Sequence, residues 1–284
     1  TKNTFKMNLN SKILITGSRG LLGSALIDLL SKNKYKKILK PSSSTLNLLD
    51  LKKTIRYFKK NKPTYIFHIA NKVYGIGGNS LAKFEMLNDN LIINSNLLKA
   101  CCEIKIKKVL CVGSSAIYSS SLKSNIKENQ CFYKEPHVSE YDYSFSKRIM
   151  LKQLQLLYRK NKIDFSYVIL NNLYGKNDNF DTLKGHVVPS IIHKTYLANK
   201  KNIDLILWGS GNEKRCLMNS KDAARALELI MKSNEKIINL SSNKEYKINE
   251  LSRLISKEFN FNNKTIWKKT FASVKRRHLN IDLI

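Results

Sequence analysis

The sequence predicts an α/β protein: a Rossmann-type, doubly wound parallel sheet followed by a smaller C-terminal α/β lobe that binds substrate. In the first two-thirds, short β-branched runs alternate with runs of helical period, the pattern of parallel strands joined by crossover helices. The first strand is followed at once by three glycines at the start of a helix, the arrangement of a dinucleotide-binding turn. After Leu173 the pattern loosens into a long polar loop, which indicates a change of domain.

The expected elements follow from periodicity. Strands of the main sheet are predicted at Lys12–Thr16, Lys37–Lys40, Thr64–Ala70, Lys107–Gly113 and Phe165–Leu170. Helices are predicted at Leu21–Leu30, Leu51–Asn61, about Leu81–Ile104 and Tyr143–Lys160. Asp50 is placed to cap the second of these helices, because its carboxylate can accept the first free N–H groups.

The later elements are shorter. They are a helix from Pro189 to about Ala198, a strand at Asp204–Trp208, a helix at Asp222–Lys232, a strand at Lys236–Ser241 and a helix at Asn249–Phe259. We expect residues 1–172 to form the Rossmann-type domain, with about 215–240 returning to it. Residues 173–214 and 241–284 then form the smaller lobe.

The composition is that of an ordinary globular chain, since apolar residues make up 42% of the 284. No stretch has the length of a transmembrane helix, and the polar N-terminal residues lack the apolar segment of a signal peptide. The five cysteines include no C-x-x-C pair and no Cys/His spacing typical of zinc sites. We therefore expect a soluble cytoplasmic protein with reduced thiols and no metal ion.

The charge balance is unusual: 51 Lys and Arg against 21 Asp and Glu give a formal net charge of +30. Such an excess is typical of nucleic-acid-binding proteins. The lysines are, however, spread along the whole chain and not gathered into a tail or an arginine-rich segment. We therefore expect neither nucleic acid nor a membrane as partner, and a basic surface also favours capture of a diphosphate-bearing substrate.

A phosphate-binding loop follows the first strand, where TGSRGLLG places Gly17, Gly20 and Gly23 three apart. One glycine permits the tight turn, another lets backbone N–H groups approach a pyrophosphate, and the last lets the helix pack on the strand. The helix N-terminus adds partial positive charge. A glycine triplet alone is a weak signal, but its strand–turn–helix context predicts dinucleotide binding.

The residues after the second strand predict NADP(H). NAD sites usually place an acid there to bond the ribose hydroxyls, whereas this chain reads ILKPSSSTLN and has none. A 2′-phosphate would instead meet Arg19 in the glycine loop and Lys40, Ser42 and Ser43 after the strand. The other expected cofactor contacts are Gly17, Ser18, Gly20, Leu21, Leu22, Gly23, Leu49, Asp50, Ala70, Lys147 and His186.

Three residues predict the chemistry. YSFSK places Tyr143 and Lys147 four apart on one helix face, and Ser114 stands at the C-terminal end of a strand, where open α/β sheets carry their sites. The pKa of a free tyrosine is roughly 10, and a neighbouring ammonium lowers it by favouring the phenolate. In this hypothesis Lys147 supplies that charge and holds the nicotinamide ribose, while Ser114 bonds the substrate oxygen. Tyr143 then protonates the alkoxide as hydride reaches the carbonyl carbon.

These motifs resemble those of the extended short-chain dehydrogenase/reductases, and more closely those of the GDP-L-fucose synthase family, NADPH-dependent epimerase/reductases of GDP-4-keto-6-deoxymannose. The matching stretches are ITGSRGLLGSAL, LNLLD (Leu46–Asp50), NKVYGIGGN (Asn71–Asn79), VGSSAIY, YSFSK, NNLYGKNDNF (Asn171–Phe180), GHVVPSII (Gly185–Ile192) and LWGSGNEKR (Leu207–Arg215). The resemblance implies an NADP-dependent oxidoreductase that acts on a GDP-linked keto-sugar as a homodimer. It also implies a further C-terminal helical segment beyond the final HLNIDLI.

One departure from the family bears on the reaction. In the family, a cysteine after the Ser-Ser pair works with a histidine to epimerise the carbons beside the ketone. The histidine matches His186, but the place of the cysteine is taken by Ala116, whose methyl group cannot accept a proton. The resemblance therefore implies reduction of the C4 ketone without epimerisation. Acids are also absent after Ser114, where 4,6-dehydratases need them, so a dehydratase is not expected.

The resemblance also implies the sugar-nucleotide contacts. Lys194 and Arg215 match positions that meet the diphosphate, and ion pairing with phosphate explains two cations there. Trp208 and Val188 match positions near the base or ribose. The full expected set is Lys72, Ser115, Tyr143, Asn172, Val188, Lys194, Trp208 and Arg215. Each cation taken alone is equally consistent with a surface charge, and a histidine in a polar loop such as His186 is often only solvated.

Two other functions stay open. The first is a full 3,5-epimerase/4-reductase that uses another base in place of the cysteine. The second is a non-catalytic NADP-binding or nucleic-acid-associated regulator, which only the charge supports and against which the presence of Ser114, Tyr143 and Lys147 argues. The sequence also leaves the sugar open between a 6-deoxy-hexose and a heptose.

Overall fold

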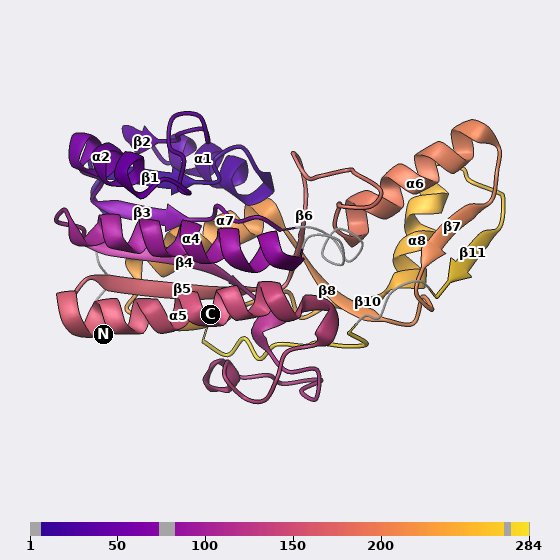
Figure 1. Cartoon of the computed structure of the whole chain (residues 1–284). Coiled ribbons are helices and arrows are strands. Elements are labelled where there is room, and N and C mark those ends of the chain that lie inside the picture. The colour runs from indigo at the N-terminus through magenta and orange to yellow at the C-terminus, as the bar shows by residue number, and fades with distance from the viewer. Residues whose placement is uncertain (1–6, 74–82, 270–273, 284) are drawn as a thin grey trace.

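A computed structural model describes residues 7–73, 83–269 and 274–283. Its larger body is a six-stranded parallel sheet in the order β2-β1-β3-β4-β5-β9, with helices on both faces (Figure 1). The strands are β1 (Lys12–Thr16), β2 (Lys37–Leu39), β3 (Tyr65–His68), β4 (Lys108–Ser114), β5 (Asp164–Leu170) and β9 (Ile237–Leu240). The predicted Rossmann-type α/β fold is confirmed.

Alternation along the strands divides the core into two layers. Leu14 and Ile66 point to the face covered by α2 (Leu51–Asn61), α4 (Lys83–Cys102) and α5 (Tyr141–Asn161). Ile13, Ile15 and Phe67 point to the opposite face, covered by α1 (Leu21–Lys32) and α7 (Ser220–Lys232). Successive side chains of a strand alternate between the two faces of the sheet, so a strand buried on both faces must be apolar throughout. The continuous apolar runs of β1, β3 and β4 predict these strands for that reason.

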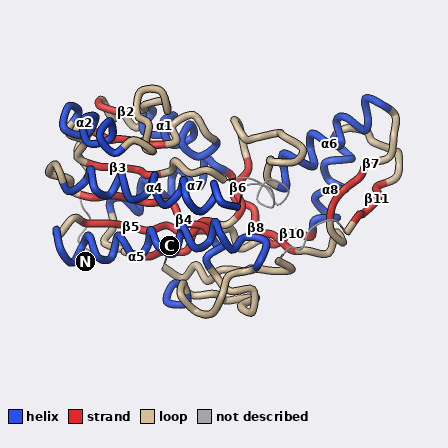
Figure 2. The backbone as a smooth tube through the Cα atoms, in the orientation of Figure 1, coloured by secondary structure: helices blue, strands red, loops and turns tan. Residues whose placement is uncertain are grey.

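The smaller lobe lies beyond the carboxyl ends of the main strands (Figure 1, Figure 2). It contains α6 (Val187–Lys201), α8 (Ile248–Glu258) and a two-stranded parallel sheet of β7 (Leu205–Trp208) and β11 (Thr265–Lys268). A three-stranded sheet of β10 (Glu245–Lys247), β8 (Lys214–Asn219) and β6 (Asn172–Tyr174) lies between this lobe and the main sheet. The smaller lobe has a separate core, which is formed by apolar residues such as Ile191, Leu205 and Leu251.

The helix bounds follow local chemistry. The Asp50 carboxylate accepts a hydrogen bond from the Lys53 amide at 2.9 Å and begins α2 as expected. Helix α6 begins at Val187, two residues before the predicted Pro189. Proline is tolerated in the first turn of a helix, where an N–H has no intrahelical partner in any case. It therefore marks that turn and not the first helical residue.

Four short strands, β6, β8, β10 and β11, were not expected. Their residues are largely half-buried or exposed, so they lack the apolar run or clean alternation that identifies a strand. Within the segment 215–240, α7 and β9 join the layers of the main sheet, whereas β8 pairs with β6 and β10. The division into two domains at the stated boundaries stays a prediction. Most of NKVYGIGGN and the predicted helix start at Leu81 lie outside the described residues.

Candidate active site

A cavity of about 380 Å³ lies between the carboxyl ends of the main strands and the smaller lobe. Its wall is lined by residues of β4, α5, α6, β7 and β8, and of the segments that follow β3 and β5. This is the position at which open α/β sheets bind ligands. Its size is that of a small-molecule site.

Among the described residues, no three His, Cys, Asp or Glu side chains are grouped so that they could hold a metal ion. No helix in the described part of the chain combines the length and apolar character that crossing a membrane requires.

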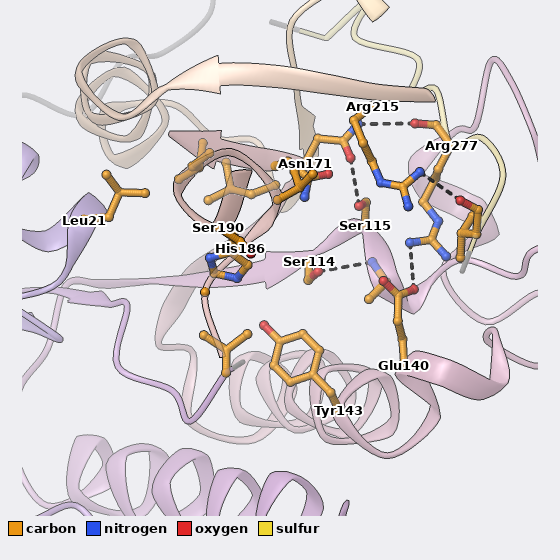
Figure 3. A pocket seen from close by; sticks show the side chains of 18 of the residues that line it. Leu21, Ser114, Ser115, Glu140, Tyr143, Asn171, His186, Ser190, Arg215 and Arg277 are labelled. Atoms are coloured by element: carbon orange, nitrogen blue, oxygen red, sulfur yellow. Dashed lines mark hydrogen bonds and ion pairs between the residues drawn. The ribbon is translucent and has the colours of Figure 1, made fainter. Parts of the chain in front are cut away.

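All four predicted catalytic residues, Ser114, Tyr143, Lys147 and His186, line this cavity. Figure 3 shows Ser114, Tyr143 and His186 among the side chains of its wall. Ser114 ends β4, and its hydroxyl oxygen accepts a hydrogen bond from the Ala116 amide at 3.2 Å. Tyr143 and Lys147 come from α5, with the Lys147 Nζ atom 5.6 Å from the centroid of the Tyr143 ring. Lys147 is 1% exposed and donates to the Val112 carbonyl at 2.7 Å. The helical spacing of four therefore does place both groups beside Ser114.

The expected lowering of the Tyr143 pKa is wrong. Burial raises the pKa of the Tyr143 phenol, the Glu140 carboxylate raises it further, and the Ser114 hydroxyl lowers it. Lys147 does not lower this pKa, because burial reduces the pKa of its own ammonium to about 7. A phenol that stays protonated at neutral pH is the form that can donate a proton.

The glycine loop has the geometry predicted for it. Gly17 has a φ of 71°, and a Cβ atom there would lie 2.8 Å from the Ala70 amide nitrogen. A Cβ atom on Gly23 would lie 2.1 Å from the Gly17 carbonyl oxygen, so helix α1 can approach the turn only through glycine. Gly20 precedes α1 and has no atom closer than 3.6 Å to such a Cβ, which leaves its surroundings open to a ligand.

One hydrogen bond joins the two segments that carry the groups predicted to bind the 2′-phosphate. The Ser18 hydroxyl donates to the Pro41 carbonyl at 3.1 Å, which ties the glycine loop to the end of β2. Arg19 and Lys40, the neighbours of these two residues, are both exposed. Ser43 is also exposed, whereas the Ser42 hydroxyl bonds those of Ser44 and Thr45 at 2.6 and 3.2 Å. Leu21 and Leu22 line the cavity itself.

The lobe end of the cavity carries cations. Lys194 lies with its Nζ atom 3.5 Å from the centroid of the Trp208 ring, and burial lowers the pKa of its ammonium to about 8. Arg215 on β8 donates to the carbonyls of Lys214 and Val274 at 2.9 and 2.8 Å. All three predicted residues line the cavity, as do Ser115, Asn172 and His186.

Several lining residues were not predicted. Arg277 is 8% exposed and pairs with Glu140 at 3.0 Å, and its buried Nε atom has no hydrogen-bond partner among the residues that the structure describes. Figure 3 shows this pair beside Arg215. Asn171 joins the wall to the C-terminal segment, since it accepts from the Ser115 hydroxyl at 3.0 Å and donates to the Arg277 carbonyl at 3.4 Å. The only sequence signal for Arg277 was its place in a basic segment, which is common throughout this chain.

Some predicted contacts lie elsewhere. Val188 packs against the core of the lobe, and its neighbour Val187 lines the cavity instead. Lys72 forms an ion pair with Asp89 and does not line the cavity. Asp50 is occupied as the cap of α2, and Leu49 beside it is exposed. The difference at Val188 arises because a helix turns by about 100° per residue, so neighbouring side chains face different sides.

Ala116 is predicted to take the place of the family's cysteine. It lines the cavity, is 4% exposed, and lies in the turn of 3-10 helix Ser115–Ile117. Cys111 and Cys131 are both buried, neither lines the cavity, and burial raises the pKa of each thiol to about 12. Neither thiol can therefore act as a base on a ligand in the cavity at neutral pH.

Comparison with known proteins agrees with this geometry. The NAD dependent epimerase/dehydratase family model matches residues 13–246. The chain is 32% identical over 293 residues to a GDP-L-fucose synthase of Dictyostelium discoideum, covering 95% of this chain and 89% of that protein. It is 30% identical to a GDP-L-colitose synthase of Yersinia pseudotuberculosis, covering 94% and 88%. A GDP-L-fucose synthetase of Naegleria fowleri bound to NADP superposes with a TM-score of 0.89 at 29% identity, over 99% of this chain and 87% of that one. The chain belongs to the NAD dependent epimerase/dehydratase family and, within it, to the GDP-L-fucose synthase-like proteins.

Proposed function

We propose that this protein reduces the C4 ketone of a GDP-linked 4-keto sugar, a 6-deoxy-hexose or a heptose, with NADPH and without epimerising it. One observation carries the proposal: the reductive residues Ser114, Tyr143 and Lys147 line the same cavity as Ala116. The cavity thus contains a proton donor for reduction, and a methyl group where epimerisation needs a base.

The cofactor fits the residues present. The turn at Gly17 and Gly23 has no room for a side chain, and Arg19 and Lys40 are exposed near it and suited to a 2′-phosphate. When bound, NADPH supplies the hydride. Lys147 would hold the nicotinamide ribose, and Leu21 and Leu22 would form the apolar wall beside the cofactor. The Naegleria fowleri relative, which binds NADP, supports this assignment.

The protein's own groups then complete the reduction. Ser114 donates a hydrogen bond to the ketone oxygen and holds the carbonyl beside Tyr143. As the carbonyl carbon accepts hydride, the oxygen becomes an alkoxide and takes the phenolic proton of Tyr143. The raised pKa of Tyr143 keeps that proton in place until the alkoxide forms. Lys147 is held beside the Tyr143 ring by its hydrogen bond to the Val112 carbonyl.

The cations at the lobe end suit the diphosphate. Arg215 and Lys194, joined by Arg277, place three cations at the lobe end of the cavity, whose wall also carries the carboxylates of Glu140 and Glu213. Arginine forks match phosphate oxygens, and Trp208 offers a ring face to the base or ribose. The Dictyostelium discoideum and Yersinia pseudotuberculosis relatives, both synthases of GDP-linked sugars, support GDP as the nucleotide.

The test is reduction in deuterated water. The protein is incubated with NADPH and a GDP-4-keto-6-deoxy sugar, NADPH oxidation is followed, and the product is examined by NMR. We expect complete reduction at C4 and no solvent deuterium at C3 or C5. Deuterium at those carbons above the spontaneous exchange of the ketone would contradict the proposal and favour a full epimerase/reductase. If NADPH is oxidised with neither a hexose nor a heptose substrate, the proposed reductase activity is contradicted.

Ala116→Cys is the matched variant for this experiment, because it restores the thiol of the family at a position that lines the cavity. Any exchange that it gains at C3 or C5, compared with the unmodified protein, measures what the missing group contributes. Tyr143→Phe serves as the negative control for reduction, since it retains the ring and loses the proton donor.

We also propose that the protein is a cytoplasmic homodimer. Ile149 and Leu156 on α5 are 36% and 51% exposed, and their spacing of seven puts them on one helix face. Helices α4 and α5 lie side by side on one face of the main sheet, and we infer that two copies pack through these helices (Figure 1). Light scattering should give the mass of a dimer, and Leu156→Glu should shift it towards a monomer. A monomeric unmodified protein would contradict the dimer.

A further inference from the structure

One buried carboxylate beside the cavity has no role in the steps above. Asp178 lies in the polar loop after β6, and its side chain is 5% exposed. Its Oδ1 atom accepts a hydrogen bond from the Asn179 amide at 2.8 Å. Its Oδ2 atom is buried and, among the described residues, has no hydrogen-bond partner. A buried carboxylate oxygen without a partner is costly, so a donor or a cation is expected next to it.

The group that faces this carboxylate is His186. The His186 Nδ1 atom lies 3.9 Å from the Asp178 Oδ1 atom, and the His186 side chain is 38% exposed and lines the cavity. This distance exceeds that of a hydrogen bond, and a movement of roughly 1 Å would close it. His186 is the N-cap residue of α6, yet its ring makes no capping bond. The ring is therefore not engaged by the helix that it begins.

The loop between the two residues is held by its own hydrogen bonds. The Asp181 carboxylate accepts from the amides of Leu183 and Lys184 at 2.8 and 2.6 Å, and the Gly185 amide donates to the Asp181 carbonyl at 2.9 Å. A Cβ atom on Gly185 would lie 2.4 Å from the carbonyl oxygens of Asn179 and Asp181. Any other residue at position 185 would clash with these carbonyl oxygens, so the turn requires glycine. This turn brings His186 to face Asp178.

We propose that Asp178 is a positioning residue for His186: it accepts a hydrogen bond from the Nδ1–H group and so leaves the Nε2 lone pair as the group that His186 presents to the cavity. Histidine nitrogens are selected in this way wherever a carboxylate binds one of them. His186 then acts on the sugar as a hydrogen-bond acceptor for a hydroxyl group, not as a donor. The statement about the sugar rests on the proposed function, whereas the orientation of the ring does not.

The test is the tautomer of His186, measured by two-bond ¹H–¹⁵N correlation NMR on protein with ¹⁵N-labelled histidine, without substrate or cofactor. Two other histidines provide internal references. The His193 Nδ1 atom lies 2.6 Å from the Phe180 carbonyl oxygen and must carry a proton. The His137 Nδ1 atom accepts from the Ser139 amide at 3.2 Å and cannot. We expect the neutral His186 signal to match the pattern of His193 and to disappear in His186→Asn, which assigns it.

Two variants test the cause. Asp178→Ala and Asp178→Leu both remove the acceptor, and leucine also fills the buried space. In both, we expect His186 to lose its single Nδ1–H form. The His193 signal reports whether the loop is intact, because its partner Phe180 belongs to the same loop. If the His193 signal also changes in Asp178→Ala, the loop is disturbed there. The effect on the His186 tautomer is then taken from Asp178→Leu. An Nε2–H tautomer in the unmodified protein, or an unchanged tautomer in the leucine variant, overturns the proposal.

A kinetic arm separates this inference from the proposed function. With a GDP-4-keto sugar, Asp178→Asn should lower kcat on the order of 10-fold while KM for NADPH stays within about twofold, a smaller loss than the 10²–10⁴-fold typical of an acid–base group itself. A protein that fails to reduce any such sugar but shows the expected tautomer refutes the proposed function and leaves the inference standing. A protein that reduces such a sugar but does not show the Nδ1–H tautomer of His186 refutes only the inference.

Discussion

Replacing Lys147 by methionine should make the cofactor-free protein more stable near neutral pH, although it removes a residue of the proposed active site. Lys147 is 1% exposed, and burial lowers the pKa of its ammonium to about 7. In an unfolded chain the same ammonium has a pKa of about 10.4. At pH 7 folding must therefore strip a proton from this lysine or bury its charge, and methionine avoids both.

The magnitude follows from the two pKa values. Between pH 7 and 10 the unfolded chain binds the Lys147 proton more tightly than the folded protein does, so the free energy of unfolding rises with pH by up to about 1.4 kcal/mol per unit. The penalty is fully present below the folded-state pKa of about 7 and disappears as the pH rises through the unfolded-state value. From pH 7 to pH 9 its change amounts to about 2 kcal/mol. Lys147→Met should lack this increment. The lost hydrogen bond to the Val112 carbonyl adds only a constant offset at pH values above the folded-state pKa, where the amine is neutral.

The assay is urea denaturation of both proteins at pH 6.5, 7, 8 and 9. The advantage of the variant over the unmodified protein should shrink as the pH rises, by about 2 kcal/mol between pH 7 and 9. Lys108→Met is the matched control, because burial lowers the pKa of Lys108 to about 8 and this residue does not line the cavity. It should show a pH dependence of the same sign but smaller, about 1.3 kcal/mol between pH 7 and 9, and it should retain NADPH oxidation. A stability difference between Lys147→Met and the unmodified protein that does not change with pH would refute the reasoning.

Three further predictions concern the cofactor and the reaction. Arg19→Ala should weaken NADPH by about 10- to 150-fold and NADH much less, because one charge-assisted bond to the 2′-phosphate is lost; an unchanged NADPH/NADH preference in binding titrations would remove Arg19 from the site. Tyr143→Phe should lower turnover by roughly 10²–10⁴-fold while NADPH still binds, and near-normal NADPH oxidation would show that another group donates the proton. Gly23→Ala, whose Cβ would lie 2.1 Å from the Gly17 carbonyl oxygen, should lower the free energy of unfolding by about 1–3 kcal/mol. Gly20→Ala should leave stability nearly unchanged and weaken NADPH only, so equal melting temperatures for the two variants would contradict this account of the turn.

Local chemistry was enough to predict much of the site from the sequence. The spacing of Tyr143 and Lys147 determines that both side chains lie on one face of α5 wherever that helix packs. Gly17 and Gly23 indicated a tight turn because a side chain cannot be placed there, and Ser114 was placed by the end of an apolar strand. Such features depend on residues a few positions apart, so they can be recognised before the tertiary structure is known.

Only the tertiary structure decided which distant groups share the cavity and how their protons are held. Glu140 and Arg277 are 137 positions apart, and no local pattern links them. The direction of the Tyr143 pKa was mispredicted because the spacing that brings Lys147 near it says nothing about burial, which here also lowers the pKa of the lysine. Desolvation depends on everything that covers a group, and the covering residues come from the whole chain. The sequence by itself therefore determined which reactive groups are present and in what local arrangement, while the packing of both lobes around them decided their charge states and their partners.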